Sequence, residues 1–184
     1  MIIIKVVLFV VISVIVTYFS RSSLRNPRSH GFYRFFAWEG IVAVISLNVD
    51  SWFTNPFSVF QIISWVLLII SAYLIIQGIT LLREIGKPNE TRDDSSLLGL
   101  EKTTQLVVVG AYRYIRHPFY SSLLFLCWGA FFKSISLAGL MLCVIATIFL
   151  ILTGKVEEKE NMRYFGKEYK EYMKKTKMFI PFVL

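Results

Sequence analysis

Residues 57–82 read FSVFQIISWVLLIISAYLIIQGITLL, a run without a single charged side chain. About 20 apolar residues in a helix are enough to cross the hydrocarbon core of a bilayer. The whole chain of 184 residues shares this character, since 55% of its residues are hydrophobic and only 17% are charged. A soluble domain of this size cannot bury that much apolar surface. The sequence therefore predicts an integral membrane protein and excludes an ordinary cytosolic enzyme, a disordered protein and a disulfide scaffold.

The sequence contains three other apolar stretches: residues 2–19, 35–53 and 119–153. Because the last of these counts as two spans, the predicted number of membrane spans is about five. The last stretch is too long for one helix, and Lys133-Ser134 divides it into two helices that form a hairpin. A cleaved signal peptide is the alternative for the first stretch, but no small-residue cleavage site follows it. The predicted fold class is an all-α integral membrane protein with a C-terminal helical hairpin.

The basic residues predict the orientation of these spans. The net charge is +8, and every Lys and Arg except Lys5 and Lys133 lies in the loops 20–34 and 83–118 or after Thr153. Cytoplasmic loops carry an excess of basic residues. Five spans with the N-terminus outside and the C-terminus in the cytoplasm place all three basic segments inside. The charge therefore indicates contact with the bilayer and not with nucleic acid.

The chain is predicted to form a single domain in four consecutive parts. They are three N-terminal spans (1–85), a cytoplasmic loop (86–118), the helical hairpin (119–154) and a cytoplasmic tail (155–184). Within the tail, residues 155–175 have the pattern of an amphipathic helix, with Met162, Phe165, Tyr169 and Tyr172 on one stripe. Such a helix lies on the headgroup layer or covers a site on the cytoplasmic face; a solvated tail is the alternative.

The densest cluster of reactive side chains is GAYRYIRHPFY, residues 110–120. Pro118 is favourable in the first turn of a helix, where its missing N–H has no intrahelical partner. The preceding His117 is then held in an extended conformation that directs its imidazole away from the helix. The alternative interpretation of Arg116 and the tyrosines is an aromatic belt with a snorkelling arginine, which needs no function.

A pair of carboxylates, Glu157-Glu158, directly follows the last apolar run. Because the hairpin is antiparallel, this pair emerges on the same face as His117, and we expect the two clusters to lie side by side. A cationic cofactor with hydroxyls and an aromatic base fits such a site, because carboxylates accept hydrogen bonds from ribose and tyrosine rings attract a sulfonium. The sequence contains no phosphate-binding glycine motif and no zinc spacing, so neither a Rossmann domain nor a metal is expected.

Two segments carry a family resemblance: TTQLVVVGAYRYIRHPFYSS (103–122) and VEEKENMRYFGKEYKEYMKKTKMFIP (156–181). They resemble the isoprenylcysteine carboxyl methyltransferase and phospholipid methyltransferase superfamily of integral membrane enzymes. The resemblance implies transfer of a methyl group from S-adenosyl-L-methionine to a lipidic or membrane-embedded acceptor at the cytoplasmic face. The acceptor is a phospholipid amine or an isoprenylcysteine-like carboxylate.

The resemblance also assigns roles to individual residues. Those implied to contact the cofactor are Gln105, Leu106, Val107, Tyr112, His117, Pro118, Tyr120 and Glu157. Those implied to be catalytic are Arg116, His117 and Glu158, with a purely structural pairing of Arg116 and Glu158 as the alternative. The prenylcysteine enzymes have a substrate arginine four residues before the cofactor glutamate, where this chain has Thr153, and this difference speaks against a carboxylate acceptor.

Two other functions remain open at this stage. An NADPH-dependent membrane sterol or enone reductase of related fold shares the R-H-P-x-Y element but lacks the acidic pair. A non-catalytic membrane scaffold is the second.

One further acid, Glu39, lies within a predicted span and is a functional candidate by default; a pairing with Arg34 is the alternative.

Overall fold

The computed structural model of the protein describes residues 2–89 and 102–183, and these residues form helices and no strand. Residues 90–101 of the predicted cytoplasmic loop 86–118 therefore lie outside the described residues. Two 3-10 turns, at Val49–Ser51 and Gly110–Arg113, accompany the α-helices. The α-helices are α1 (Ile2–Leu24), α2 (His30–Asn48), α3 (Val59–Glu84), α4 (Pro118–Phe131), α5 (Leu137–Phe165) and α6 (Lys167–Lys175).

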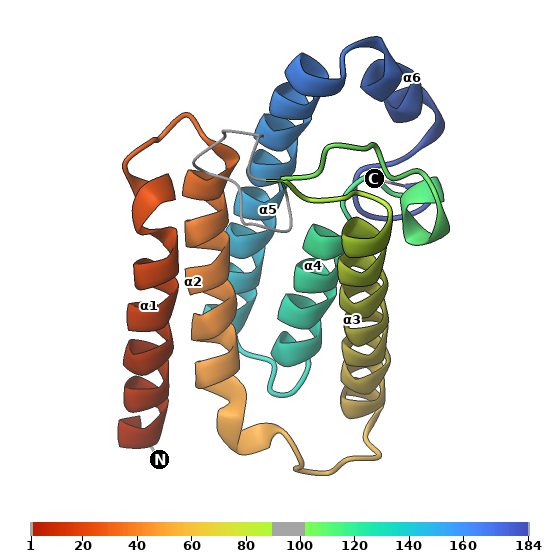
Figure 1. The fold of residues 1–184 in the computed structure, drawn as a ribbon. Helices are drawn as coiled ribbons and strands as arrows, with labels where there is room; N and C mark the ends of the chain where they lie inside the picture. The colour runs from red at the N-terminus through yellow and green to blue at the C-terminus, as the bar shows by residue number, and fades with distance from the viewer. Residues whose placement is uncertain (1, 90–101, 184) are drawn as a thin grey trace.

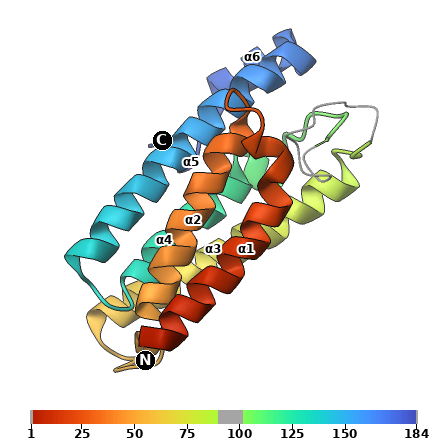
Figure 2. The ribbon, with the colours of Figure 1, turned by 90° about the vertical axis from the view of Figure 1, so that its left-hand side faces the viewer.

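Helices α1 to α5 run side by side in one elongated bundle, as Figures 1 and 2 show. The main packing pairs are α1 on α2, α2 on α5, and α3 on α4. The N-terminus lies at one end of the bundle, whereas α6 and the C-terminal segment lie at the other. Everything that follows α5 is therefore placed above the same end of the bundle as the loop that precedes α4.

Among the described residues, four helices are long and apolar enough to span a membrane: α1, α2 with the turn that follows it, α3 and α5. The fifth, α4, has 14 residues. At a rise of about 1.5 Å per residue it is about 21 Å long, shorter than a hydrocarbon core of about 30 Å. The all-helical fold is thus confirmed, and α4 forms the first arm of the predicted hairpin. Five complete crossings remain a prediction.

Residues 155–175 were predicted to form one amphipathic helix, and they are helical but divided between the end of α5 and α6. Helix α5 continues without interruption to Phe165, and the chain turns at Gly166, which has a positive φ of 61°. Glycine adopts this conformation without the steric cost that a side chain imposes. The change from apolar to charged residues after Thr153 marks a change of environment along α5, and the helix continues through Gly154 without a break.

Small residues bring α2, α4 and α5 close together. A side chain at Gly40 of α2 would place its Cβ 3.0 Å from the Cβ of Ala146 on α5. Nearby, the two cysteines Cys127 and Cys143 are fully buried, and their Sγ atoms lie 3.3 Å apart as free thiols. Helices in membranes pack most closely where residues are small. This crossing fixes how α5 lies against the rest of the bundle.

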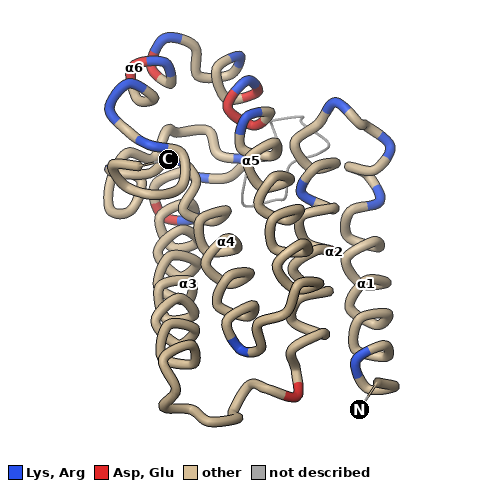
Figure 3. Tube along the Cα trace, turned by 180° about the vertical axis from the view of Figure 1, so that it is seen from behind, with Lys and Arg blue, Asp and Glu red and all other residues tan. Residues whose placement is uncertain are grey.

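The end of the bundle opposite α6 contains few charges (Figure 3). Lys5 forms an ion pair of 2.8 Å with Asp50, and Lys133 donates a hydrogen bond of 3.0 Å to Gln61. The Lys133 ammonium also lies 3.3 Å from the ring centroid of Trp65. The two lysines that the charge analysis assigned to the far side are therefore at one end of the molecule, opposite the basic end.

The structure does not pair Glu39 with Arg34. A carboxylate oxygen of Glu39 accepts a hydrogen bond of 2.6 Å from Ser13 of α1. Arg34 lies one helical turn after His30, with its guanidinium 3.5 Å from the His30 ring. Glu39 faces α1, whereas Arg34 lies against His30 and Trp38 of its own helix. A step of five residues along a helix leaves the two side chains about 140° apart around its axis.

We predict that Gly40→Ala lowers the thermal unfolding midpoint of the detergent-solubilised protein by a few degrees. The added methyl group meets the backbone and Cβ of Ala146, and overpacking of this kind costs about 1–3 kcal/mol. The matched control is Gly78→Ala, where the nearest atom to the new Cβ is 3.7 Å away. A midpoint that falls equally in both variants would contradict close packing of α2 on α5.

Candidate active site

The segment before α4 is held against α3 by one side chain. The amide oxygen of Gln77 accepts a hydrogen bond of 3.2 Å from the backbone N–H of Ala111. The adjacent Gly110 has a φ of 58°, and a Cβ there would lie 2.7 Å from Leu81. A glycine is therefore required where the chain turns tightly over the end of α3. This turn leads the chain into Tyr112 and onward to His117.

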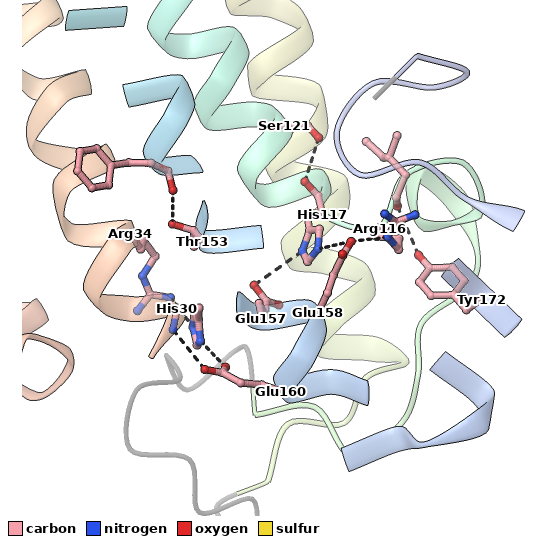
Figure 4. Close-up of polar contacts among 12 residues, drawn as sticks. His30, Arg34, Arg116, His117, Ser121, Thr153, Glu157, Glu158, Glu160 and Tyr172 are labelled. Carbon is pink, nitrogen blue, oxygen red and sulfur yellow. Dashed lines mark hydrogen bonds and ion pairs between the residues drawn. The ribbon is translucent and has the colours of Figure 1, made fainter. Parts of the chain in front are cut away.

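His117 occupies the N-cap position of α4, directly before Pro118. Its side chain is buried, and its ring lies between two carboxylates: Nδ1 is 3.7 Å from Glu157 and Nε2 is 3.5 Å from Glu158. The ring also stacks on Tyr120, with 5.4 Å between centroids. The predicted meeting of the histidine-proline segment with the acidic pair is therefore present, as Figure 4 shows.

Arg116 joins three parts of the chain that are distant in sequence. Its Nε donates to Glu158 of α5 at 2.5 Å, and its Nη1 donates to the backbone oxygens of Met173 and Thr176. Both charged side chains are nearly buried, with exposed fractions of 10% for Arg116 and 8% for Glu158. Removing one partner of such a buried ion pair strongly destabilises a protein, because the other charge is left buried and unpaired. It fixes the loop, α5 and the C-terminal segment relative to one another.

A cavity opens between the segment before α4, the end of α5, and α6. It contains about 790 Å3 of space not filled by atoms, its open mouth included. Seven of the residues predicted for the site line it: Leu106, Val107, Tyr112, Arg116, His117, Tyr120 and Glu157.

Three predicted residues do not line the cavity. Gln105 is exposed, Pro118 is buried within the first turn of α4, and Glu158 is engaged by Arg116. Pro118 and Glu158 nevertheless adjoin His117, so they are placed to orient it. Gln105 is fixed through its backbone N–H, which donates to Gly86 at 3.2 Å, and this contact leaves its side chain outside the cavity.

Several lining residues were missed by the sequence analysis or only partly anticipated. Asn161 and Phe165 continue the face of α5 that carries Glu157, at spacings of four residues. That spacing is a readable signal once α5 is known to continue past Thr153. The remaining lining residues are Ile79, Leu82, Thr103, Phe119, Tyr169 and Tyr172.

Two tyrosines of α6 cover the cavity. Burial raises the pKa of Tyr169, and the negative charges of Glu157 and Glu158 raise it further. Burial also raises the pKa of Tyr172, in spite of the opposing charge of Arg116. Both hydroxyls therefore stay protonated near neutral pH. The Tyr172 hydroxyl donates to the backbone oxygen of Tyr112 at 2.6 Å, which fastens α6 to the loop.

A second polar cluster lies beside the cavity, at the start of α2 (Figure 4). The carboxylate of Glu160 lies 2.6 Å from Nδ1 of His30 and accepts a hydrogen bond of 3.2 Å from the His30 backbone N–H. Through this contact the polar end of α5 is fastened to α2 as well as to α4. Neither residue was predicted, because they are separated by 130 positions in the sequence.

The described part of the chain contains no group of three or more His, Cys, Asp and Glu side chains placed to hold a metal ion. The acids near the cavity are paired with His117, Arg116 and His30.

Part of the chain is similar in sequence to known proteins. The chain is similar to the methanethiol S-methyltransferases of Pseudomonas deceptionensis (29% identical over 70 residues, 38% of this chain and 26% of that protein) and Crocosphaera subtropica (29% over 72 residues, 39% and 28%). It is likewise similar to methanethiol S-methyltransferase 1 of Bradyrhizobium diazoefficiens (31% over 71 residues, 38% and 24%). The matched segment thus spans about a quarter of each relative's length. No solved structure matches the chain significantly.

A family match extends over a larger part of the chain. Residues 59–168 match the phospholipid methyltransferase family. This range runs from the start of α3 to the first residues of α6, and it includes His117, Arg116 and the acidic pair. Because the match covers more than half of the chain, the protein belongs to the phospholipid methyltransferase family.

Proposed function

We propose that this protein transfers a methyl group from S-adenosyl-L-methionine to a membrane-embedded acceptor. The observation that carries the proposal is the cavity between His117 and Glu157, where the two halves of the family motif meet. S-adenosyl-L-methionine supplies an activated methyl group on a sulfonium. The reaction then requires little beyond binding, alignment and exclusion of water.

The residues of the cavity fit this methyl donor in charge and in polarity. The Glu157 carboxylate, with a side chain 15% exposed, is available for a ribose hydroxyl or an amine. Asn161 offers an amide on the same face of α5, and the rings of Tyr112, Tyr120 and Tyr169 offer faces for a cation. Leu106 and Val107 form an apolar wall suited to an aromatic base. We assign donor binding to these residues and to His117.

The acceptor reaches the site from the bilayer in this proposal. Ile79 and Leu82 at the end of α3, together with Phe119 of α4, line the apolar side of the cavity. Since α3 is a candidate membrane span, this side is continuous with the region that lipid contacts. A phospholipid amine, an isoprenylcysteine-like carboxylate and a small thiol of the kind named for the relatives are the acceptor classes we consider.

Thr153 argues against the carboxylate among these acceptors. It lies one turn before Glu157 on α5, is fully buried, and donates its hydroxyl to the backbone oxygen of Phe149 at 2.7 Å. It therefore offers neither a positive charge nor a free donor to an anionic group. A neutral amine or a thiol needs no cation at that position.

We assign the proton transfer to His117 and an orienting role to Glu158. An amine acceptor has to lose a proton before or during methyl transfer, and imidazole is the side chain best suited to take it near neutral pH. Glu158 is held by Arg116 and faces the ring of His117, so it orients the imidazole and balances its charge. Arg116 acts through Glu158 and the C-terminal segment.

We also propose that the end with α6 faces the cytoplasm. The basic residues concentrate at this end, around the α1–α2 connection and along the end of α5 and α6 (Figure 3). The excess of Lys and Arg on cytoplasmic segments is the strongest sequence determinant of orientation. In this arrangement the segment 102–118 and the tail 155–183 enclose the site on the cytoplasmic side, and the N-terminus is outside.

The methyl donor site is tested by ligand-induced stabilisation. We predict that S-adenosylhomocysteine raises the thermal midpoint of the purified protein and that NADP does not. Glu157→Gln should weaken this binding roughly 10- to 100-fold, because a hydrogen bond to a charged group is worth about 1.5–3 kcal/mol. Glu171→Gln removes an exposed carboxylate of α6 and is the matched control.

Stabilisation by NADP alone would contradict the proposal and indicate a reductase. Stabilisation by neither ligand would indicate a non-catalytic scaffold. Equal binding in Glu157→Gln and the unaltered protein would remove Glu157 from the donor site.

The acceptor is identified by labelling. Membranes that contain the protein are incubated with methyl-labelled S-adenosyl-L-methionine, and the products are separated into lipids, prenylated peptides and volatile thioethers. We expect label in a lipid amine or a thioether. His117→Ala should reduce the label by at least 100-fold, since proton transfer contributes about 10²–10⁴-fold. Full labelling by correctly inserted His117→Ala would contradict the role of this histidine.

A further inference from the structure

Two cavities meet at Tyr114 on the outer surface of the C-terminal segment, away from the candidate active site. One lies against α3 and is lined by Tyr73, Leu74, Gln77, Ile115 and Pro181, among others. The second lies beyond α6 and is lined by Lys175, Lys177 and Phe182, among others. Tyr114 and Pro181 line both, and no residue of either cavity lines the active-site cavity. We call the two together the C-terminal groove.

The floor of the groove is fixed by backbone hydrogen bonds. The Lys177 N–H donates to the oxygen of Tyr114 at 3.0 Å, and the Arg116 N–H donates to the oxygen of Lys177 at 2.8 Å. The C-terminal segment is therefore paired with the segment before α4 as a short parallel bridge. This pairing holds the backbones of Tyr114 and Lys177 side by side, so their side chains extend from neighbouring points.

The half of the groove along α3 is suited to an acyl chain. Tyr73, 57% exposed, projects from a helix that is a candidate membrane span, and Leu74 lies beside it. At the other end of the groove, Phe182 is 86% exposed and Val183 is 73% exposed. Exposed aromatic residues next to an apolar span are typical of the membrane–water interface. The groove therefore runs from the level of the hydrocarbon towards the level of the headgroups.

The half beyond α6 carries positive charge. Lys174 is paired with Glu171 at 2.6 Å. Lys175 and Lys177 are both exposed, and no carboxylate in the described part of the chain pairs with either of them. The hydrogen bond from Lys174 lowers the pKa of the Glu171 carboxyl group, and Lys175 also lies close enough to lower it, whereas no such contact among the described residues involves Lys177. Ammonium groups beside aromatic rings attract a lipid phosphate, and basic residues near a membrane surface favour anionic lipids.

From these observations we propose that the C-terminal groove binds an anionic phospholipid. Its phosphate lies at Lys175 and Lys177, and one acyl chain lies along Tyr73 and Leu74. The inner side of the same segment packs on the candidate active site, where Phe179 contacts the ring of His117 with 6.0 Å between centroids. The bound lipid thus holds in place the segment that supports His117 from behind. This lipid is a resident ligand of the fold and is not the methyl acceptor.

The test measures binding of dimyristoylphosphatidylglycerol to the full-length protein in detergent by native mass spectrometry, with dimyristoylphosphatidylcholine and inorganic phosphate as comparison probes. We expect phosphatidylglycerol to bind in preference to both. The double variant Lys175→Gln/Lys177→Gln should weaken this binding on the order of twentyfold, since each basic residue near a membrane surface contributes about fivefold. The double variant Lys167→Gln/Lys170→Gln removes the same charge from exposed positions on α6 outside the groove and should bind normally.

A photoactivatable phosphatidylglycerol, with its reactive group in the acyl chain, keeps the proposal testable if a variant fails to fold. On the unaltered protein it should label peptides that contain Tyr73 or Tyr114. Equal binding of phosphatidylcholine, equal loss in both double variants, competition by inorganic phosphate alone, or labelling confined to other helices would each overturn the proposal. All of these readouts are independent of methyl transfer, so they stand or fall separately from the proposed enzymatic function.

Discussion

The ion pair between Arg116 and Glu158 is the constraint on which the rest of this structure depends. At 2.5 Å, and nearly buried, it joins the segment before α4 to the polar end of α5. The same guanidinium holds the backbone of the C-terminal segment at Thr176. These contacts link three parts of the chain that are remote in sequence at the place where the cavity forms. His117 is oriented because its neighbours on both sides are fixed.

The continuity of α5 distributes three carboxylates in three directions. Glu157 faces the cavity, Glu158 faces Arg116, and Glu160 faces His30 at the start of α2. Successive positions on a helix are separated by about 100°, so a rigid helix presents nearby acids to different neighbours. The turn at Gly166 then brings α6 back over the cavity. One helix thereby binds two others and contributes to the candidate site, which explains why its polar end is ordered helix and not a loose tail.

The sequence predicted the meeting of His117 with the acidic pair, because an antiparallel hairpin leaves its two ends on one face. It did not predict where α5 ends, since the loss of hydrophobicity after Thr153 marks a change of surroundings and not a helix stop. Asn161 was missed for the same reason. The contact of Glu160 with His30 depends on the packing of α2 on α5, and no local pattern specifies such packing. The side chain of Gln105 was placed in the site by resemblance, whereas the structure fixes this residue through its backbone contact with Gly86 and leaves the side chain exposed.

The central claim is that one small molecule touches both the segment before α4 and the polar end of α5. Direct ultraviolet photolabelling of the protein with radiolabelled S-adenosyl-L-methionine, followed by peptide mapping, tests this claim most directly. The account predicts label on peptides from residues 103–120 and from residues 157–172, with both lost together when unlabelled S-adenosylhomocysteine is added. Label on only one of these segments, or on the far end of the bundle near Lys133, would contradict it.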